Sequence, residues 1–220
     1  MHHAVFFDVD GVLLDSLPQH LAICADKASE FGLELAVPDP AGFRRMLASG
    51  VSVSPMLNFF RAVGFSQALA ERATADYERE FMQRYRPRPF TGIDTMLQRL
   101  HALGFSLGLV TANTAANVEP ALGDAMRHFD PRCRFYFDSF TPARSKADSL
   151  AEGARRLGTA TEAIVFVGDQ PADAKAAAEA ACAFLAVSYG WGFSQEDIAW
   201  SADGVDTIVE ALLTGPPDPA

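Results

Sequence analysis

Short apolar runs along the chain alternate with segments in which apolar residues recur at helical spacing. The first run, Ala4–Phe7, is rich in strand formers and stops at Asp8-Val9-Asp10-Gly11. Later runs of the same kind are Phe105–Thr111, Phe135–Phe137, Ala163–Val167 and Ala183–Val187. Helices are predicted at Ile93–Leu103, Ala115–Met126, Ser149–Leu157, Ala172–Ala181 and Glu196–Leu213. This alternation predicts an α/β fold, a doubly wound parallel sheet with helices on both faces.

Residues 16–88 break the alternation, because they contain helical patterns and no convincing strand. Two stripes at helical spacing stand out: Leu21, Cys24, Ala28 and Phe31, and then Leu69, Ala73, Tyr77 and Phe81. Pro87-Arg88-Pro89 closes the segment with a stiff, non-helical passage. We therefore expect residues 1–15 and 89–214 to form the α/β core and residues 16–88 a smaller all-helical cap. The tail, residues 215–220, has no periodicity and is predicted to be disordered.

The composition restricts the class of partner. Eighteen Lys and Arg against 28 Asp and Glu give a formal net charge of −10, which argues against a nucleic-acid backbone or an anionic membrane as partner. The three cysteines lack CxxC spacing and fit a reducing compartment. The N-terminus lacks the pattern of a secretory signal, and no apolar stretch has the length of a membrane span. We expect a cytoplasmic protein, monomeric or homodimeric.

Carboxylates follow two of the predicted strands. Asp8 and Asp10 come after the first strand, and Asp169 and Asp173 follow the strand at Ala163–Val167. Because ligands of an open parallel sheet bind outside the carboxyl ends of its strands, these four residues are expected at one edge of the sheet. Their mutual repulsion requires protons or a cation. Carboxylate oxygens suit Mg²⁺, so the four aspartates are candidate ligands of a magnesium ion.

Two other strand ends supply groups that bind an anion. Thr111 ends one predicted strand, and Ala112 and Asn113 follow it at the start of a predicted helix. The free N–H groups at the start of this helix are expected to form a phosphate cradle. Lys146 follows the strand at Phe135–Phe137. Together these parts allow one carboxylate to attack phosphorus while a second carboxyl protonates the leaving oxygen. Spacing alone does not decide which aspartate has which role.

The segment Phe7-Asp8-Val9-Asp10-Gly11-Val12-Leu13-Leu14-Asp15-Ser16 resembles the first motif of the haloacid dehalogenase-like hydrolases. The other motifs of that family follow in order: Thr111 resembles the second, Lys146 the third and Gly168–Asp173 the fourth. Tyr189-Gly190-Trp191-Gly192 and the position of the helical insertion resemble the phosphoglycolate phosphatase-like branch. The resemblance covers nearly the whole chain and implies a Rossmann-like core with a helical cap.

The resemblance also implies roles for individual residues. Asp8 would be the nucleophile, with its carboxylate and the Asp10 carbonyl on Mg²⁺, and Asp10 would be the general acid and base. Asp169 would bind the metal directly, whereas Asp173 would act through water or through a neighbouring ligand. The dehalogenases of the family lack an acid at the position of Asp10, so the chain resembles a phosphatase or a phosphomutase. Ala112, Gln170 and the lack of a proline after Lys146 depart from the common pattern.

The substrate of such an enzyme is a small phosphorylated metabolite, and the sequence leaves its identity open. Arg45, Ser49 and Gly50 lie in a polar break between helices of the insertion and resemble the cap loop that reaches substrate in this family, although an exposed loop explains them as well. Our prediction is a Mg²⁺-dependent phosphatase, phosphoglycolate phosphatase-like, that works through an aspartyl-phosphate. The alternatives are a phosphomutase and a non-catalytic, partner-binding member of the family.

Overall fold

A computed structural model of the chain describes residues 3–51, 53, 55–139, 144–193 and 198–216. The chain divides into two compact units. One comprises Met1–Asp15 and Pro89–Ala220, and the other comprises Ser16–Arg88. They are called the core unit and the helical unit below.

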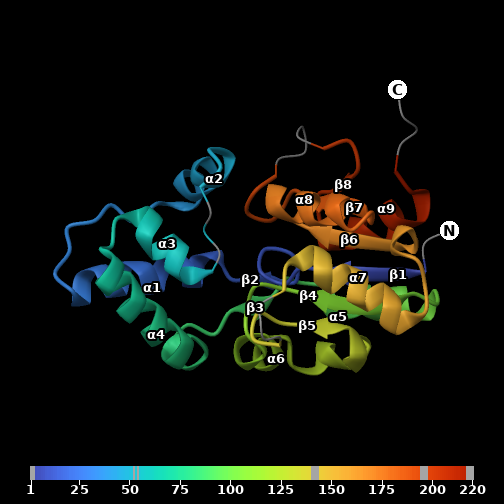
Figure 1. Cartoon of the computed structure of the whole chain (residues 1–220), viewed down its shortest axis with the longest axis horizontal. Coiled ribbons are helices and arrows are strands. Elements are labelled where there is room, and N and C mark those ends of the chain that lie inside the picture. Colours follow the sequence, from blue (N-terminus) through green and yellow to red (C-terminus); the bar gives the residue numbers. More distant parts are fainter. Residues whose placement is uncertain (1–2, 52, 54, 140–143, 194–197, 217–220) are drawn as a thin grey trace. The chain divides into compact units, whose positions relative to one another are not determined.

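The core unit is built on a six-stranded parallel sheet (Figure 1). Its strands are β1 (Ala4–Phe7), β4 (Ser106–Val110), β5 (Arg134–Phe135), β6 (Ile164–Gly168), β7 (Ala183–Val187) and β8 (Ser201–Ala202). Their order in the sheet is β5-β4-β1-β6-β7-β8, so β1 lies between β4 and β6. From β1 the chain continues to β4 and β5 on one side, and it then crosses to β6, β7 and β8 on the other side. The strand order therefore reverses between β1 and β6, the place at which such sheets bind ligands at the carboxyl ends of their strands.

Helices cover both faces of this sheet, which confirms the predicted doubly wound fold. On one face, Val5 and Phe7 of β1 belong to a core that includes residues of α5 (Ile93–Ala102), α6 (Ala115–Leu122) and α9 (Ile208–Thr214). On the other face, Ala4 and Phe6 pack in a cluster with residues of α7 (Lys146–Leu157) and α8 (Pro171–Glu179). Short 3₁₀ segments complete the unit at Gly123–His128, Pro131–Cys133, Thr161–Ala163 and Val205–Thr207.

The helix predicted at Glu196–Leu213 is wrong over most of its length. Residues 196–197 lie outside the described residues, Ser201–Ala202 form β8, and the helix α9 begins only at Ile208. The N–H groups of Ala186 and Ser188 donate to the carbonyls of Trp200 and Ala202 (3.2 and 3.0 Å), so this segment extends the sheet. A run of two paired residues is too short to produce an alternating pattern, which explains the error.

Two further elements are shorter than predicted. The helix after Thr111 ends at Leu122 and continues as a 3₁₀ segment from Gly123, and the strand predicted at Phe135–Phe137 consists of Arg134–Phe135. Gly123 has φ of +53°, a conformation that ends a helix. No helix in the described part of the chain is long and apolar enough to cross a membrane.

The helical unit contains α1 (Leu17–Glu30), α2 (Pro40–Ala48), α3 (Met56–Val63) and α4 (Gln67–Arg84). Aromatic rings form much of its interior, with ring centroids 5.4 Å apart for Phe43 and Phe59 and 5.2 Å apart for Phe60 and Phe65. Where the chain passes between the units, the short strands β2 (Leu14–Asp15) and β3 (Arg88–Pro89) pair with each other. The tail predicted to be disordered lies mostly outside the described residues, which end at residue 216.

Candidate active site

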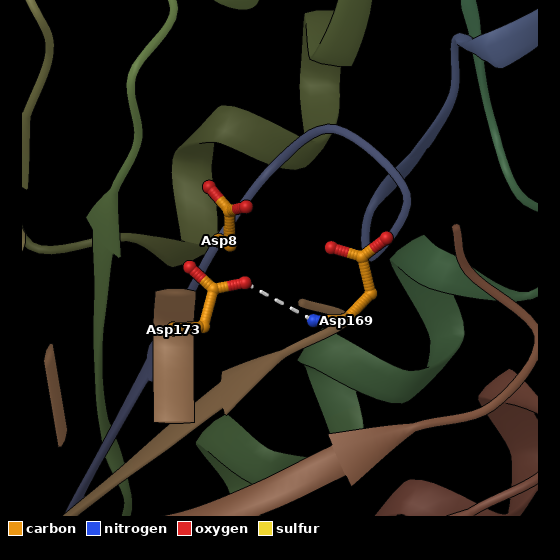
Figure 2. Close-up of side chains that lie close together, drawn as sticks. All are labelled: Asp8, Asp169 and Asp173. Atoms are coloured by element: carbon orange, nitrogen blue, oxygen red, sulfur yellow. Dashed lines mark hydrogen bonds between the residues drawn. The ribbon is translucent and has the colours of Figure 1, made fainter. Parts of the chain in front are cut away.

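Adjacent strands bring Asp8 and Asp169 to the same edge of the sheet. Phe7 of β1 is in register with Val167 of β6, and the Asp8 N–H donates to the Val167 carbonyl over 2.9 Å. Asp169 directly follows β6, and Asp173 lies in the first turn of α8. Figure 2 shows that the three carboxylates gather in one place. The structure therefore brings together three of the four aspartates that the sequence predicts as metal ligands.

The three carboxylates form a compact and dry cluster. One oxygen from each of Asp8, Asp169 and Asp173 lies within 4.8 Å of the others. Their exposed fractions are 4%, 0% and 1%, so water screens their repulsion poorly. Three carboxylates this close together require protons or a positive group at the same place.

Asp173 is fixed by hydrogen bonds on both of its oxygens. Its Oδ2 accepts from the backbone N–H groups of Asp169 (3.2 Å) and Gln170 (3.1 Å), as part of a capping box at the start of α8. Figure 2 marks the first of these bonds. Its Oδ1 accepts from Lys146 Nζ over 2.6 Å. Asp173 therefore ties the end of β6 to the lysine.

Lys146, the first residue of α7, supplies the cation that the cluster contains. Its Nζ lies 3.0 Å from Asp8 Oδ2 as well as 2.6 Å from Asp173 Oδ1. Burial alone would lower the pKa of Lys146, but the Asp173 and Asp8 carboxylates outweigh burial and raise the pKa above its usual value. The ammonium group therefore stays charged beside Asp8.

One lysine does not neutralise the cluster. Burial, opposed by Lys146 and reinforced by Asp173 and Asp10, raises the pKa of Asp8 to about 7. Burial and the neighbouring carboxylates also raise the pKa of Asp169 well above its ordinary range. Asp169 Oδ1 is buried and has no hydrogen-bond partner among the described residues. A further cation on Asp8 and Asp169 would satisfy this oxygen, so the donor set fits a hard divalent ion.

Two glycines and a backbone N–H shape the surroundings of Asp169. A Cβ atom on Gly11, which has φ of +80°, or on Gly190 would collide with the Asp169 side chain. The Trp191 N–H donates to Asp169 Oδ2 over 2.6 Å. Sequence reasoning missed this bond, because any residue type can donate a backbone N–H. Gly190 and Gly192, on either side of Trp191, were the only sign in the sequence that the backbone passes close to another group here.

Asp10 lies beside the cluster and its carboxylate is not among the grouped oxygens. A tight turn carries it, in which the Gly11 N–H donates to the Leu14 carbonyl and the Leu14 N–H donates to the Val9 carbonyl, both over 2.9 Å. The Asp10 side chain is half-buried, and its Oδ2 accepts from Asn113 Nδ2 over 2.9 Å. Its predicted contact with the metal concerns the backbone carbonyl.

The predicted phosphate cradle follows β4 next to these residues. The Thr111 N–H donates to the Phe135 carbonyl (3.0 Å), which joins the end of β4 to β5. The Asn113 N–H donates to Thr111 Oγ1 over 3.1 Å. Thr111 and Asn113 are buried and Ala112 is half-buried. The Asn113 side chain is directed to Asp10, a contact that sequence reasoning missed.

The three cap residues singled out in the sequence belong to the helical unit. Arg45 lies in the last turn of α2, Ser49 ends that helix, and Gly50 follows with φ of +81°. All three are exposed, and Ser49 Oγ donates to the Met46 carbonyl over 2.8 Å. Their contact with a substrate stays a prediction.

Comparison with known proteins points to one family. The model of the haloacid dehalogenase-like hydrolases matches residues 5–187. The chain is 32% identical over 212 residues to a phosphoglycolate phosphatase of Xanthomonas campestris, covering 91% of this chain and 90% of that protein. It is 28% identical over 210 residues to an N-acetylmuramic acid 6-phosphate phosphatase of Pseudomonas aeruginosa, covering 91% and 88%.

A solved structure shares the fold. A haloacid dehalogenase-like family hydrolase from Streptococcus pneumoniae superimposes with a TM-score of 0.78 at 21% identity, covering 96% of this chain and 98% of that one. The Rossmann-like core with a helical insertion is therefore common to both proteins.

Proposed function

Because the chain belongs to the haloacid dehalogenase-like hydrolase family, we propose that it is a Mg²⁺-dependent phosphatase that hydrolyses a small phosphomonoester through an aspartyl-phosphate at Asp8. The observation that carries this proposal is the position of Lys146 Nζ, 3.0 Å from Asp8 and 2.6 Å from Asp173. A buried nucleophile beside a fixed cation is what phosphoryl transfer to a carboxylate requires.

Asp8 acts first in the proposed reaction. One of its carboxylate oxygens attacks phosphorus, the bond from phosphorus to the ester oxygen breaks, and that oxygen takes a proton from Asp10. Lys146 stabilises the charge on Asp8 and on the transferred group. Thr111 and the Ala112 N–H bind the phosphoryl oxygens, since the next N–H groups, those of Asn113 and Thr114, donate to side chains.

Asp10 then works in the opposite direction. Its carboxylate removes a proton from water, the water oxygen attacks phosphorus, and the bond between phosphorus and Asp8 breaks. Phosphate leaves, Asp8 is again a carboxylate and Asp10 again holds a proton. One residue thus serves as acid and base in successive steps.

Asp8, Asp169 and the Asp10 carbonyl would hold Mg²⁺, with Asp173 acting through water or a neighbouring ligand. When bound, the ion supplies positive charge that offsets the carboxylates and the phosphoryl oxygens. The raised pKa values of Asp8 and Asp169 and the unpaired Asp169 Oδ1 support this assignment.

The relatives suggest where to look for the substrate. The substrates in their names, phosphoglycolate and N-acetylmuramic acid 6-phosphate, are phosphomonoesters that also carry a carboxyl group. We propose a phosphorylated carboxylic acid as substrate of this chain, with residues 16–88 as the cap that selects it and Arg45, Ser49 and Gly50 as its contacts. Cytoplasmic location and a monomeric or homodimeric state belong to the same proposal.

The test is phosphate release from a panel of phosphomonoesters, with Mg²⁺ and with a chelator. The panel includes both named compounds and neutral sugar phosphates. Asp8→Asn should lower Mg²⁺-dependent turnover by at least about 10³-fold, since it removes the nucleophile. Asp124→Asn makes the same charge change at an exposed position and should leave turnover unchanged.

Other outcomes identify the alternatives. A phosphomutase would convert a sugar phosphate into an isomer without releasing phosphate, and ³¹P NMR would detect this conversion. Absence of both turnover and Mg²⁺ binding would favour a partner-binding protein.

A further inference from the structure

Two asparagines hold the carboxyl group of Asp10 in place. We propose that Asn113 is a positioning residue for Asp10 and that Asn117 positions Asn113, an inference that rests on the proposed phosphatase activity. Asn113 Nδ2 donates to Asp10 Oδ2 over 2.9 Å, and Asn117 Nδ2 donates to Asn113 Oδ1 over 3.0 Å. Both asparagines are buried, with exposed fractions of 7% and 3%.

The orientation of the Asn113 carboxamide follows from its backbone neighbour. The Thr114 N–H donates to Asn113 Oδ1 over 2.8 Å. A backbone N–H can only donate, so the side-chain atom that faces it must be the oxygen. The nitrogen therefore faces Asp10, and Asn117 must offer its own nitrogen to the remaining side of Oδ1.

This arrangement suits a carboxyl group that gives and takes a proton. Oδ2 of Asp10 accepts from Asn113 whether the group is ionised or carries its proton on the other oxygen. The hydrogen bond therefore persists through both proposed steps and keeps the Asp10 side chain in one rotamer. Because Asn113 follows β4 and Asn117 lies on α6, the rest of the fold holds this rotamer, independently of the Asp10 turn.

A positioning role differs measurably from phosphate binding, the role expected for Asn113 from its place in the sequence. Loss of a phosphate contact weakens the reaction of every phosphomonoester to a similar extent. Loss of a positioned acid matters most when the leaving oxygen needs a proton. An alkyl ester needs that proton, whereas p-nitrophenolate leaves readily without it.

The experiment compares kcat/KM for an alkyl phosphomonoester, the best one from the substrate panel, with kcat/KM for p-nitrophenyl phosphate. This parameter covers the steps through ester cleavage, so the later attack of water does not enter it. For Asn113→Ala we expect a loss of about 30-fold with the alkyl ester and less than about 3-fold with the aryl ester. Asn117→Ala should shift the ratio in the same direction by a smaller factor, since Thr114 still orients the amide.

Ala116→Gly is the matched control, because it weakens α6 at an exposed position and leaves both asparagines in place. Its kcat/KM ratio between the two esters should equal that of the unmodified protein, and thermal unfolding shows whether each variant is folded. Equal losses with both esters in folded Asn113→Ala and Asn117→Ala would overturn the positioning role while leaving the phosphatase intact. Absence of turnover of either ester by the unmodified protein with Mg²⁺ would overturn both proposals.

Discussion

Each of the two units surrounds a lysine with carboxylates, and the two clusters differ in how their charge is balanced. In the helical unit, Lys27 Nζ lies 2.8 Å from Glu30, 3.0 Å from Asp76 and 3.4 Å from Glu80. In the core unit, Lys146 contacts Asp8 and Asp173, with Asp169 beside them. Each lysine therefore lies in a cluster that contains three acidic groups.

The helical unit supplies further cations to its cluster. Arg79 pairs with both Asp76 and Glu80, and Arg84 lies 2.9 Å from Glu80. Burial opposes ionisation of Asp76, but Lys27 and Arg79 outweigh it and lower the pKa of Asp76; Arg79 and Arg84 lower the pKa of Glu80. These carboxylates are stable as anions without any ligand.

The core cluster is left with a deficit of positive charge. Asp8 and Asp169 are more deeply buried than Glu80 and Glu30, and the pKa of each is raised. A protein that only needed stability would place another cation there, as the helical unit does. The deficit supports the proposed metal site, because a bound cation would complete the charge balance.

Among the changes that test the comparison of the two lysine clusters, removal of the core lysine should have the largest effect. Lys146→Met should lower kcat by about 10²–10³-fold, because the phosphoryl group loses a fixed cation. Steady-state phosphate release under saturating Mg²⁺ measures it. Lys175→Met, at a lysine whose side chain is 77% exposed, removes the same charge and should have no effect. Full activity of Lys146→Met would show that the core lysine, like Lys27, only balances charge.

The effect of Mg²⁺ on stability should come next in size and should depend on pH. The pKa of Asp8 is raised from 3.8 to about 7 on folding, so its contribution to stability is fully present below about pH 4 and is lost as pH rises through 7. The contribution of Asp8 to the free energy of unfolding of the metal-free protein should therefore decrease between pH 5.5 and pH 8.

Mg²⁺ competes with protons for the same carboxylates and should raise the melting temperature more at pH 8 than at pH 5.5. At 100 times its dissociation constant the ion adds about 2.7 kcal/mol, or roughly 5–10 °C for a chain of this size. Thermal melts with Mg²⁺ and with a chelator at both pH values measure this. An equal shift at the two pH values would contradict the assignment of the metal to Asp8 and Asp169.

The smallest effect is expected from the helical unit. Lys27→Met should lower the free energy of unfolding by about 2 kcal/mol, because Asp76 stays buried and keeps only its arginine partner. Urea unfolding measures the loss, again with Lys175→Met as control. Turnover per folded molecule should be unchanged. A kcat effect as large as that of Lys146→Met would remove the distinction between the two clusters.

The contacts inside the helical unit were only partly predictable. In the first of the two predicted stripes, Cys24 and Ala28 are buried as expected, whereas Leu21 and Phe31 are half-buried. His20 and Lys27 are buried in α1 despite their polarity. Helical spacing gives the direction of a side chain, but partners on α4, Tyr77 for His20 and Asp76 for Lys27, make burial of these two polar groups possible.

The sequence by itself determined the strand ends that carry Asp8, Asp169 and Thr111. A buried strand followed by an abrupt polar stop is a local pattern, and parallel strands bring such stops to one edge of a sheet. Lys146 was anticipated in a different way, because its place in the order of motifs resembles the third motif of the family.

Only the tertiary structure decided which atoms meet at that edge. The Trp191 N–H on Asp169, the Asn113 amide on Asp10 and the extension of the sheet by Ser201–Ala202 join segments distant in the chain. The contact of Trp191 and the pairing of Ser201–Ala202 use backbone groups. Every residue type supplies these groups, so the sequence does not reveal such contacts. The contact between Asn113 and Asp10 depends on the orientation of the Asn113 amide. Hydrogen bonds from Thr114 and Asn117 fix this orientation in the folded loop between β4 and α6.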